Sequence, residues 1–90
     1  MVLKNIKSNP YYHFVEVLGT NSEFIEIDTW CQLMFGHASD RTWWKDLINE
    51  EPFDKLHLKL KRNPNYDRVS DFRYRFAKAE HREWFILRWS

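Results

Sequence analysis

The sequence is poor in the residues that bridge or sharply bend a chain: among 90 residues it has one cysteine, two glycines and three prolines. The lone Cys31 cannot form an internal disulfide, which excludes a disulfide-stabilised scaffold. Gly19 and Gly36 lie too far apart for a glycine-rich phosphate-binding loop. No stretch approaches the roughly 20 apolar residues of a membrane span, so we expect no membrane partner. The N-terminal residues also lack the apolar run of a secretion signal, and we expect a cytoplasmic protein.

Aromatic residues are abundant, since 18% of the chain is Phe, Tyr or Trp, including five tryptophans. Each buried ring removes roughly 150–250 Å² from water, so a chain of this length can close a core. The composition excludes an intrinsically disordered chain and predicts a single domain spanning residues 1–90. So many rings cannot all be buried in a small domain, and those left outside are candidate contacts.

The formal net charge is +1, but the charge is unevenly distributed along the chain. Residues 1–50 carry four basic and seven acidic side chains, whereas residues 51–90 carry ten basic and six acidic ones. The C-terminal half could therefore meet an anionic partner, or the two halves could neutralise each other by packing together.

The first half predicts a strand followed by a helix. Tyr11–Leu18 is dense in aromatic and β-branched residues, which favours a strand that ends at Gly19. Thr20 and Glu23 have the spacing of a capping box, so we expect a helix over about 21–35 that ends at Gly36. The alternative is a hairpin that pairs 11–18 with 23–27, followed by a shorter helix. The apolar stripe of the expected helix comprises Phe24, Ile27, Cys31 and Met34.

The second half contains two alternating runs. Residues 41–48 predict either a short strand or one helical turn. Leucines then alternate with polar residues over 56–60, and aromatics alternate with charged residues over 71–76, on either side of an Asn-Pro-Asn turn. This pattern predicts an antiparallel hairpin; the alternative is a short helix that starts at Pro52, with Phe53, Leu56 and Leu60 on one side.

The last stretch, 77–90, predicts a helix that packs its rings on the sheet, with a terminal strand over 84–89 as the alternative. Together these elements predict an α+β fold. We expect a small, mainly antiparallel sheet of about three strands with two helices packed on one face.

Two local patterns carry a resemblance to a known group of proteins. One is Trp30-Cys31, three residues, then Phe35-Gly36; the other runs from Tyr74-Arg75-Phe76 through His81 to Phe85-Ile-Leu-Arg-Trp89, with Trp43-Trp44 between the two. Together they resemble small accessory proteins of tailed bacteriophages. The resemblance implies an intracellular accessory protein made in infected bacteria, and it carries no catalytic residues with it.

Catalytic and metal-binding patterns are missing from the sequence. Zinc sites usually pair His or Cys residues two to four positions apart, whereas the four histidines here are widely separated. Cys31 falls within an apolar helical stripe, where a thiolate would be poorly stabilised. We therefore expect no enzyme, no metal and no cofactor.

Two surfaces remain as candidates for a partner. The predicted hairpin would gather basic side chains on one strand face, where they could hold phosphates of a nucleic acid. Exposed aromatics are the second candidate, because Trp and Tyr dominate protein–protein hot spots. In a strand, adjacent Trp43 and Trp44 face opposite ways, so one ring can be buried while the other meets a partner. The candidate partner-binding residues are Trp43, Trp44 and Tyr66, and the candidate nucleic-acid contacts are His57, Lys59, Lys61, Arg62, Arg73 and Arg75.

The sequence thus favours a protein that binds and modulates a host protein. A nucleic-acid-binding module that uses the basic hairpin face is the alternative. A symmetric homodimer that covers the excess tryptophans is a third hypothesis.

Overall fold

Residues 6–9, 13–38 and 42–90 are described by the computed structural model of the chain. Among them, four strands form one antiparallel sheet in the order β1-β2-β4-β3. Three helices accompany the sheet, so the α+β class predicted from the sequence is confirmed, with one helix more than expected. The elements are β1 (Ile6–Asn9), β2 (Phe14–Thr20), α1 (Asn21–Phe35), β3 (Trp43–Glu50), α2 (Phe53–Arg62), β4 (Val69–Phe76) and α3 (Ala79–Trp89).

The ends of α1 follow the sequence prediction. The hydroxyl of Thr20 accepts a hydrogen bond from the backbone N–H of Glu23 at 3.3 Å, and the Glu23 carboxylate accepts one from the backbone N–H of Thr20 at 3.0 Å. This reciprocal pair satisfies two backbone donors that the first helical turn leaves free. The helix ends at Gly36, whose φ of 87° is readily accessible to glycine but rare for other residues.

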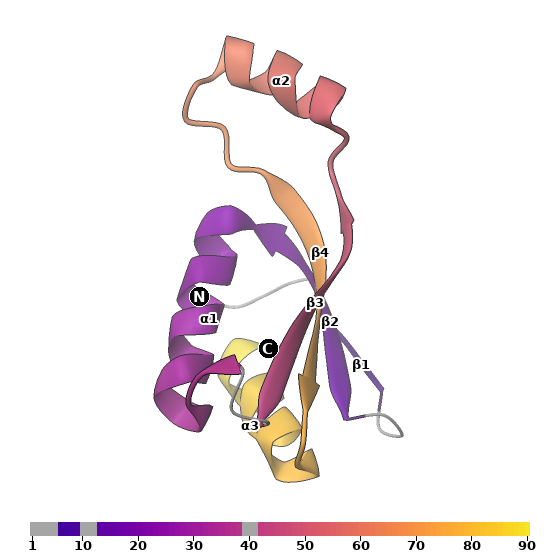
Figure 1. Ribbon diagram of the computed structural model, residues 1–90, viewed down its shortest axis with the longest axis vertical. Coiled ribbons are helices and arrows are strands. Elements are labelled where there is room, and N and C mark those ends of the chain that lie inside the picture. Colours follow the sequence, from indigo (N-terminus) through magenta and orange to yellow (C-terminus); the bar gives the residue numbers. More distant parts are fainter. Residues whose placement is uncertain (1–5, 10–12, 39–41) are drawn as a thin grey trace.

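The core lies between the sheet and the helices α1 and α3, which cover the same face (Figure 1). Phe85 and Trp89 of α3 pack with the rings of α1 and of the central strand β4, as in the edge-to-face contact between Trp30 and Trp89 at 6.0 Å. The expected C-terminal helix is therefore confirmed. The buried apolar residues are Val15, Val17, Phe24, Ile27, Cys31, Phe35, Trp43, Tyr74, Phe76, Phe85 and Trp89.

One polar group ties α1 to the sheet beside this core. Asp28 accepts hydrogen bonds from the Lys45 ammonium and from the Tyr74 hydroxyl, both at 2.7 Å. The Lys45 ammonium also lies 4.0 Å from the centre of the Phe72 ring, a favourable cation–π distance. Burial and the neighbouring Asp28 carboxylate raise the pKa of Tyr74, which keeps its hydroxyl protonated as a donor.

Residues 53–62 form a helix, so the predicted hairpin of 56–60 with 71–76 is wrong. The partners of β4 are β2 and β3 instead. The leucines at 56, 58 and 60 mimic a strand pattern, but Pro52 and Asp54 suit a helix start and the basic residues at 59–62 suit a helix end. The alternative helix from Pro52 is the arrangement that forms.

The helix α2 extends away from the layers formed by the sheet, α1 and α3 (Figure 1). It sits between β3 and β4, which pair directly with each other, so residues 51–68 form an arm inserted between two neighbouring strands. The molecule measures 42 × 24 × 24 Å, and its radius of gyration is 14.1 Å. A compact domain of this length would have a radius of about 12 Å, and the arm accounts for the elongation.

Trp43 and Trp44 are adjacent in β3, so their side chains point to opposite faces of the sheet, as the sequence predicts. Trp43 is 2% exposed and its ring N–H donates to the Gly36 carbonyl at 2.7 Å, whereas Trp44 is 37% exposed. The expectation that Trp43 contacts a partner is therefore wrong, since the ring is a core residue.

Alanine substitution should separate the two tryptophans. Trp43→Ala should lower the free energy of unfolding by about 3–5 kcal/mol, because it leaves a cavity and an unpaired carbonyl. Trp44→Ala should cost about 1 kcal/mol or less, since its main contact is a cation–π contact with Arg75 at 5.7 Å. Urea denaturation of the two variants measures the difference, and equal losses would contradict this division.

Candidate binding surfaces

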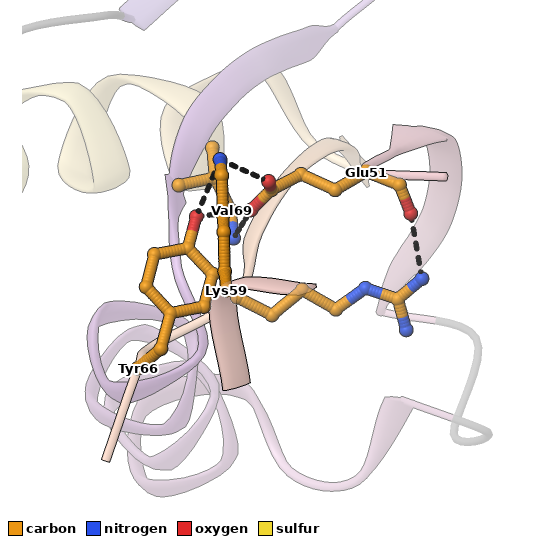
Figure 2. Close-up of polar contacts among 5 residues, drawn as sticks. Glu51, Lys59, Tyr66 and Val69 are labelled. Carbon is orange, nitrogen blue, oxygen red and sulfur yellow. Dashed lines mark hydrogen bonds and ion pairs between the residues drawn. The ribbon is translucent and has the colours of Figure 1, made fainter. Parts of the chain in front are cut away.

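The arm is closed at its base by Glu51, which follows β3 directly. One oxygen of its carboxylate accepts hydrogen bonds from the Tyr66 hydroxyl and from the backbone N–H of Val69, the latter at 3.0 Å. The other oxygen lies 2.5 Å from the ammonium of Lys59 on α2 (Figure 2). We call these residues, together with Arg68, the Glu51 cluster. The cluster connects three parts of the chain: the segment that follows β3, the helix α2, and the segment that returns to β4.

The donors around Glu51 hold its carboxylate in the charged form. Hydrogen bonds from Lys59, Tyr66 and Val69 lower the pKa of Glu51 from 4.5 to about 2. The hydrogen bonds of Lys59 with Glu51 and with Tyr66 raise the pKa of Lys59. Only 14% of the Glu51 side chain is exposed, so few of its hydrogen-bonding positions are left to water.

The returning segment is also fixed to the body of the molecule. The Arg68 guanidinium donates to the backbone carbonyl of Glu51 at 2.9 Å, and the Arg68 carbonyl accepts from the backbone N–H of Asn21 at 3.0 Å. Asp67 accepts from the backbone N–H of Ser22 at 3.2 Å. Hydrogen bonds from the Ser22 side chain and then from its backbone lower the pKa of Asp67. The base of the arm is thus attached to the first turn of α1 as well as to both strands.

Beyond this base, α2 has no buried residue. Phe53 is 75% exposed, Leu58 59% and Leu60 38%, while Leu56 is partly buried. A ten-residue helix has little stability of its own in water, because isolated helices shorter than about 12–15 residues are marginal. Contacts at its ends, rather than burial of an apolar face, therefore hold α2 in place.

A groove of about 420 Å³ separates α2 from the end of the sheet. Its walls carry both signs of charge, with Lys55 and Lys59 from the helix and carboxylates from the strand ends. The helix is therefore not packed directly on the sheet along this side. The groove is lined by Leu18, Asn49, Glu50, Glu51, Pro52, Lys55, Lys59, Val69, Ser70 and Asp71.

Opposite the helices, the other face of the sheet carries alternating charges and rings. Arg73 pairs in register with Glu16 on one side and Asp46 on the other, and its guanidinium lies 2.8 Å from the Glu16 carboxylate. Arg75 lies between Phe14 and Trp44 in register, and its Nε lies 2.8 Å from the Asp46 carboxylate. Basic and acidic groups therefore neutralise each other across neighbouring strands on this open face.

The candidate nucleic-acid contacts are not brought together as the sequence predicted. His57, Lys59, Lys61 and Arg62 lie on α2, whereas Arg73 and Arg75 lie on β4. The continuous basic strand face expected from a hairpin does not form. Lys59 is bound to Glu51, and both arginines of β4 are in ion pairs.

Of the candidate partner-binding residues, only Trp44 is an exposed ring on the open face of the sheet. Tyr66 is partly buried and its hydroxyl belongs to the Glu51 cluster, so its role in the fold is to anchor the arm. Sequence reasoning missed Glu51, whose signal is weak because one carboxylate after a strand is an ordinary pattern.

Within the described ranges, no three His, Cys, Asp or Glu side chains gather in a way that could hold a metal ion. Burial raises the pKa of the Cys31 thiol, which keeps it in the unreactive protonated form. Among those same residues, no helix has both the length and the apolar character needed to cross a membrane.

Comparisons of the chain with protein-family models, with curated proteins and with solved structures found no match.

Replacing Glu51 by Gln should loosen the arm selectively. The variant keeps the size of the side chain but loses the charge that attracts Lys59, so amide hydrogen exchange should accelerate several-fold in α2. Exchange in β2 and β4 should change little. Glu26→Gln, on the exposed side of α1, is the matched control, and equal effects of the two variants would contradict a specific role for Glu51.

The arm should also respond to acid. Because the pKa of Glu51 is lowered to about 2, its contribution to stability is complete above about pH 4.5 and is lost as the pH falls from 4.5 through 2. Titration of the Glu51 carboxyl carbon by NMR should give a midpoint near 2. In a Lys59→Met, Tyr66→Phe double variant the midpoint should move up toward 4.5, and a wild-type midpoint near 4.5 would show that the cluster does not form.

Proposed function

We propose that the chain is a small non-enzymatic protein that acts by binding another protein. The observation that carries this proposal is α2, an exposed helix with apolar side chains that the rest of the chain leaves uncovered. Scattered exposed leucines are ordinary on a protein surface. Here, however, they lie on a helix that extends away from the core (Figure 1). The Glu51 cluster fixes this helix at the base of the arm (Figure 2).

The resemblance to small phage proteins makes a host protein the expected partner, and binding would modulate that protein in the bacterial cytoplasm. Trp44 on the open face of the sheet is a second candidate contact, since tryptophan and arginine side by side are frequent in protein–protein hot spots. The alternative of a nucleic-acid-binding module receives less support. Its expected basic strand face is absent, and the arginines of β4 are already paired with carboxylates.

Affinity capture from bacterial lysate tests the proposal. The tagged full chain should retain one protein in roughly stoichiometric amount, and nuclease treatment of the lysate should not change this. A Phe53→Ser, Leu60→Ser double variant should retain much less of the same protein. Both side chains are exposed, so the variant should fold normally.

Leu33→Ser is the matched control, because Leu33 is 82% exposed on α1, away from the arm. Its capture should equal that of the wild type. Retention that disappears after nuclease treatment would favour the nucleic-acid alternative, and the absence of any stoichiometric protein would count against the proposal.

A further inference from the structure

The apolar side chains of α2 have the spacing of a docking helix. Phe53, Leu56 and Leu60 stand at positions i, i+3 and i+7, which place them on one side of the helix. His57 extends this side, and its ring lies parallel to that of Phe53, with 6.2 Å between centroids. We call these four residues the α2 stripe. Helices that bind in apolar grooves of other proteins use anchors with this spacing.

The charges of α2 are unbalanced, in contrast to those of the open sheet face. The helix carries four basic residues and one acidic residue, Asp54. Lys59 is bound to Glu51, but Lys55, Lys61 and Arg62 have no ion-pair partner in the described part of the chain. Lys61 lies one turn beyond His57, and Arg62 is the last residue of the helix. The basic groups at the C-terminal end of α2 are therefore available to carboxylates of another molecule.

The base of the arm is arranged before any partner binds. Glu51, Lys59 and Tyr66 connect both ends of the inserted segment, so α2 need not fold from a disordered state during binding. Ordering side chains and loops on binding costs free energy, and a helix that is already held in place avoids part of that cost.

From these three observations we propose that α2 is a docking helix: the α2 stripe enters an apolar groove of the partner protein, and acidic residues at the rim of that groove bind Lys61, which borders the stripe. This inference rests on the proposed function, because it names the chemistry of the protein that the chain binds.

A protein groove fits α2 better than a lipid or nucleic-acid surface does. Anionic lipid would attract Lys61, but Asp54 in the first turn of the same helix would be repelled. A nucleic acid would satisfy the basic groups and leave Phe53 and Leu60 in water. A groove with a local acidic rim satisfies the apolar and the basic side chains together.

Site-specific crosslinking in the full chain tests the inference. Photoreactive benzoylphenylalanine is introduced, in separate variants, at positions 53 and 60 on α2, at 44 on the open sheet face and at 33 on α1. Each variant is irradiated in bacterial lysate and the crosslinked peptides are identified by mass spectrometry. Positions 53 and 60 should crosslink to the same protein, at peptides that lie near Asp or Glu residues, and position 33 should not crosslink to it.

Charge reversal supplies the second measurement. With the captured protein purified, Lys61→Glu should weaken binding at least tenfold at about 150 mM salt, since the basic group loses an ionic contact and the new carboxylate meets repulsion. Lys61→Arg should bind as the wild type does. Phe53→Ser should also weaken binding about tenfold or more, as expected for an anchor residue.

The outcomes separate the inference from the function on which it rests. A protein captured and crosslinked from position 44 alone would overturn the docking helix and leave the proposed function standing. No captured protein and no crosslink at any position would overturn both. Cosedimentation of the wild type, but not of Phe53→Ser, with vesicles of phosphatidylcholine and phosphatidylglycerol would identify lipid as the occupant and overturn the groove.

Discussion

The arm depends on one carboxylate. Residues 51–68 leave and rejoin the sheet between strands that pair directly with each other, so the two ends of the insertion must be held together where they meet. Glu51 does this by accepting bonds from Lys59 on the helix and from Tyr66 and Val69 on the returning segment. Hydrogen bonds to a charged acceptor are stronger than those between neutral groups. The three hydrogen bonds to the Glu51 carboxylate can therefore hold a helix that has no buried residue.

Two different kinds of force therefore stabilise the two parts of the molecule. The sheet, α1 and α3 bury a continuous set of rings, and the Asp28 contacts with Lys45 and Tyr74 add a polar element beside it. The arm has almost no such burial and relies on hydrogen bonds and ion pairs at its base. Local opening of the arm should consequently cost less free energy than opening of the sheet, because buried apolar contacts are what resist unfolding.

Local sequence patterns correctly predicted the features that depend on neighbouring residues, such as helix ends and the alternation of side chains in a strand. The Thr20–Glu23 box and Gly36 bounded α1 correctly, and the alternation of Trp43 and Trp44 placed one ring inside and one outside. Which of the two is buried depends on which face of β3 meets the core, where Trp43 lies beside Phe76, and no local pattern reveals this. The leucines at 56, 58 and 60 suggested a strand because Leu58 falls outside the side of the helix that carries Leu56 and Leu60. The period-two spacing then outweighed the signals of a helix start and end. The Glu51 cluster escaped prediction because its donors come from positions 59, 66 and 69, which only the folded arm brings together.

The helix of the arm differs from the open face of the sheet in how its basic residues are paired. The sequence places an excess of basic residues in the C-terminal half, and in the fold Arg68, Arg73 and Arg75 of that half are bound to carboxylates. On α2, by contrast, Lys55, Lys61 and Arg62 share an exposed helix with Phe53 and Leu60 and have no such partners among the described residues. The fold neutralises the charges of its open sheet face but leaves on α2 basic and apolar side chains that bury little surface within the chain. The arrangement is explained if the missing contacts are made with another molecule, and for this reason the α2 stripe, rather than the sheet, is the surface on which we base the proposed function.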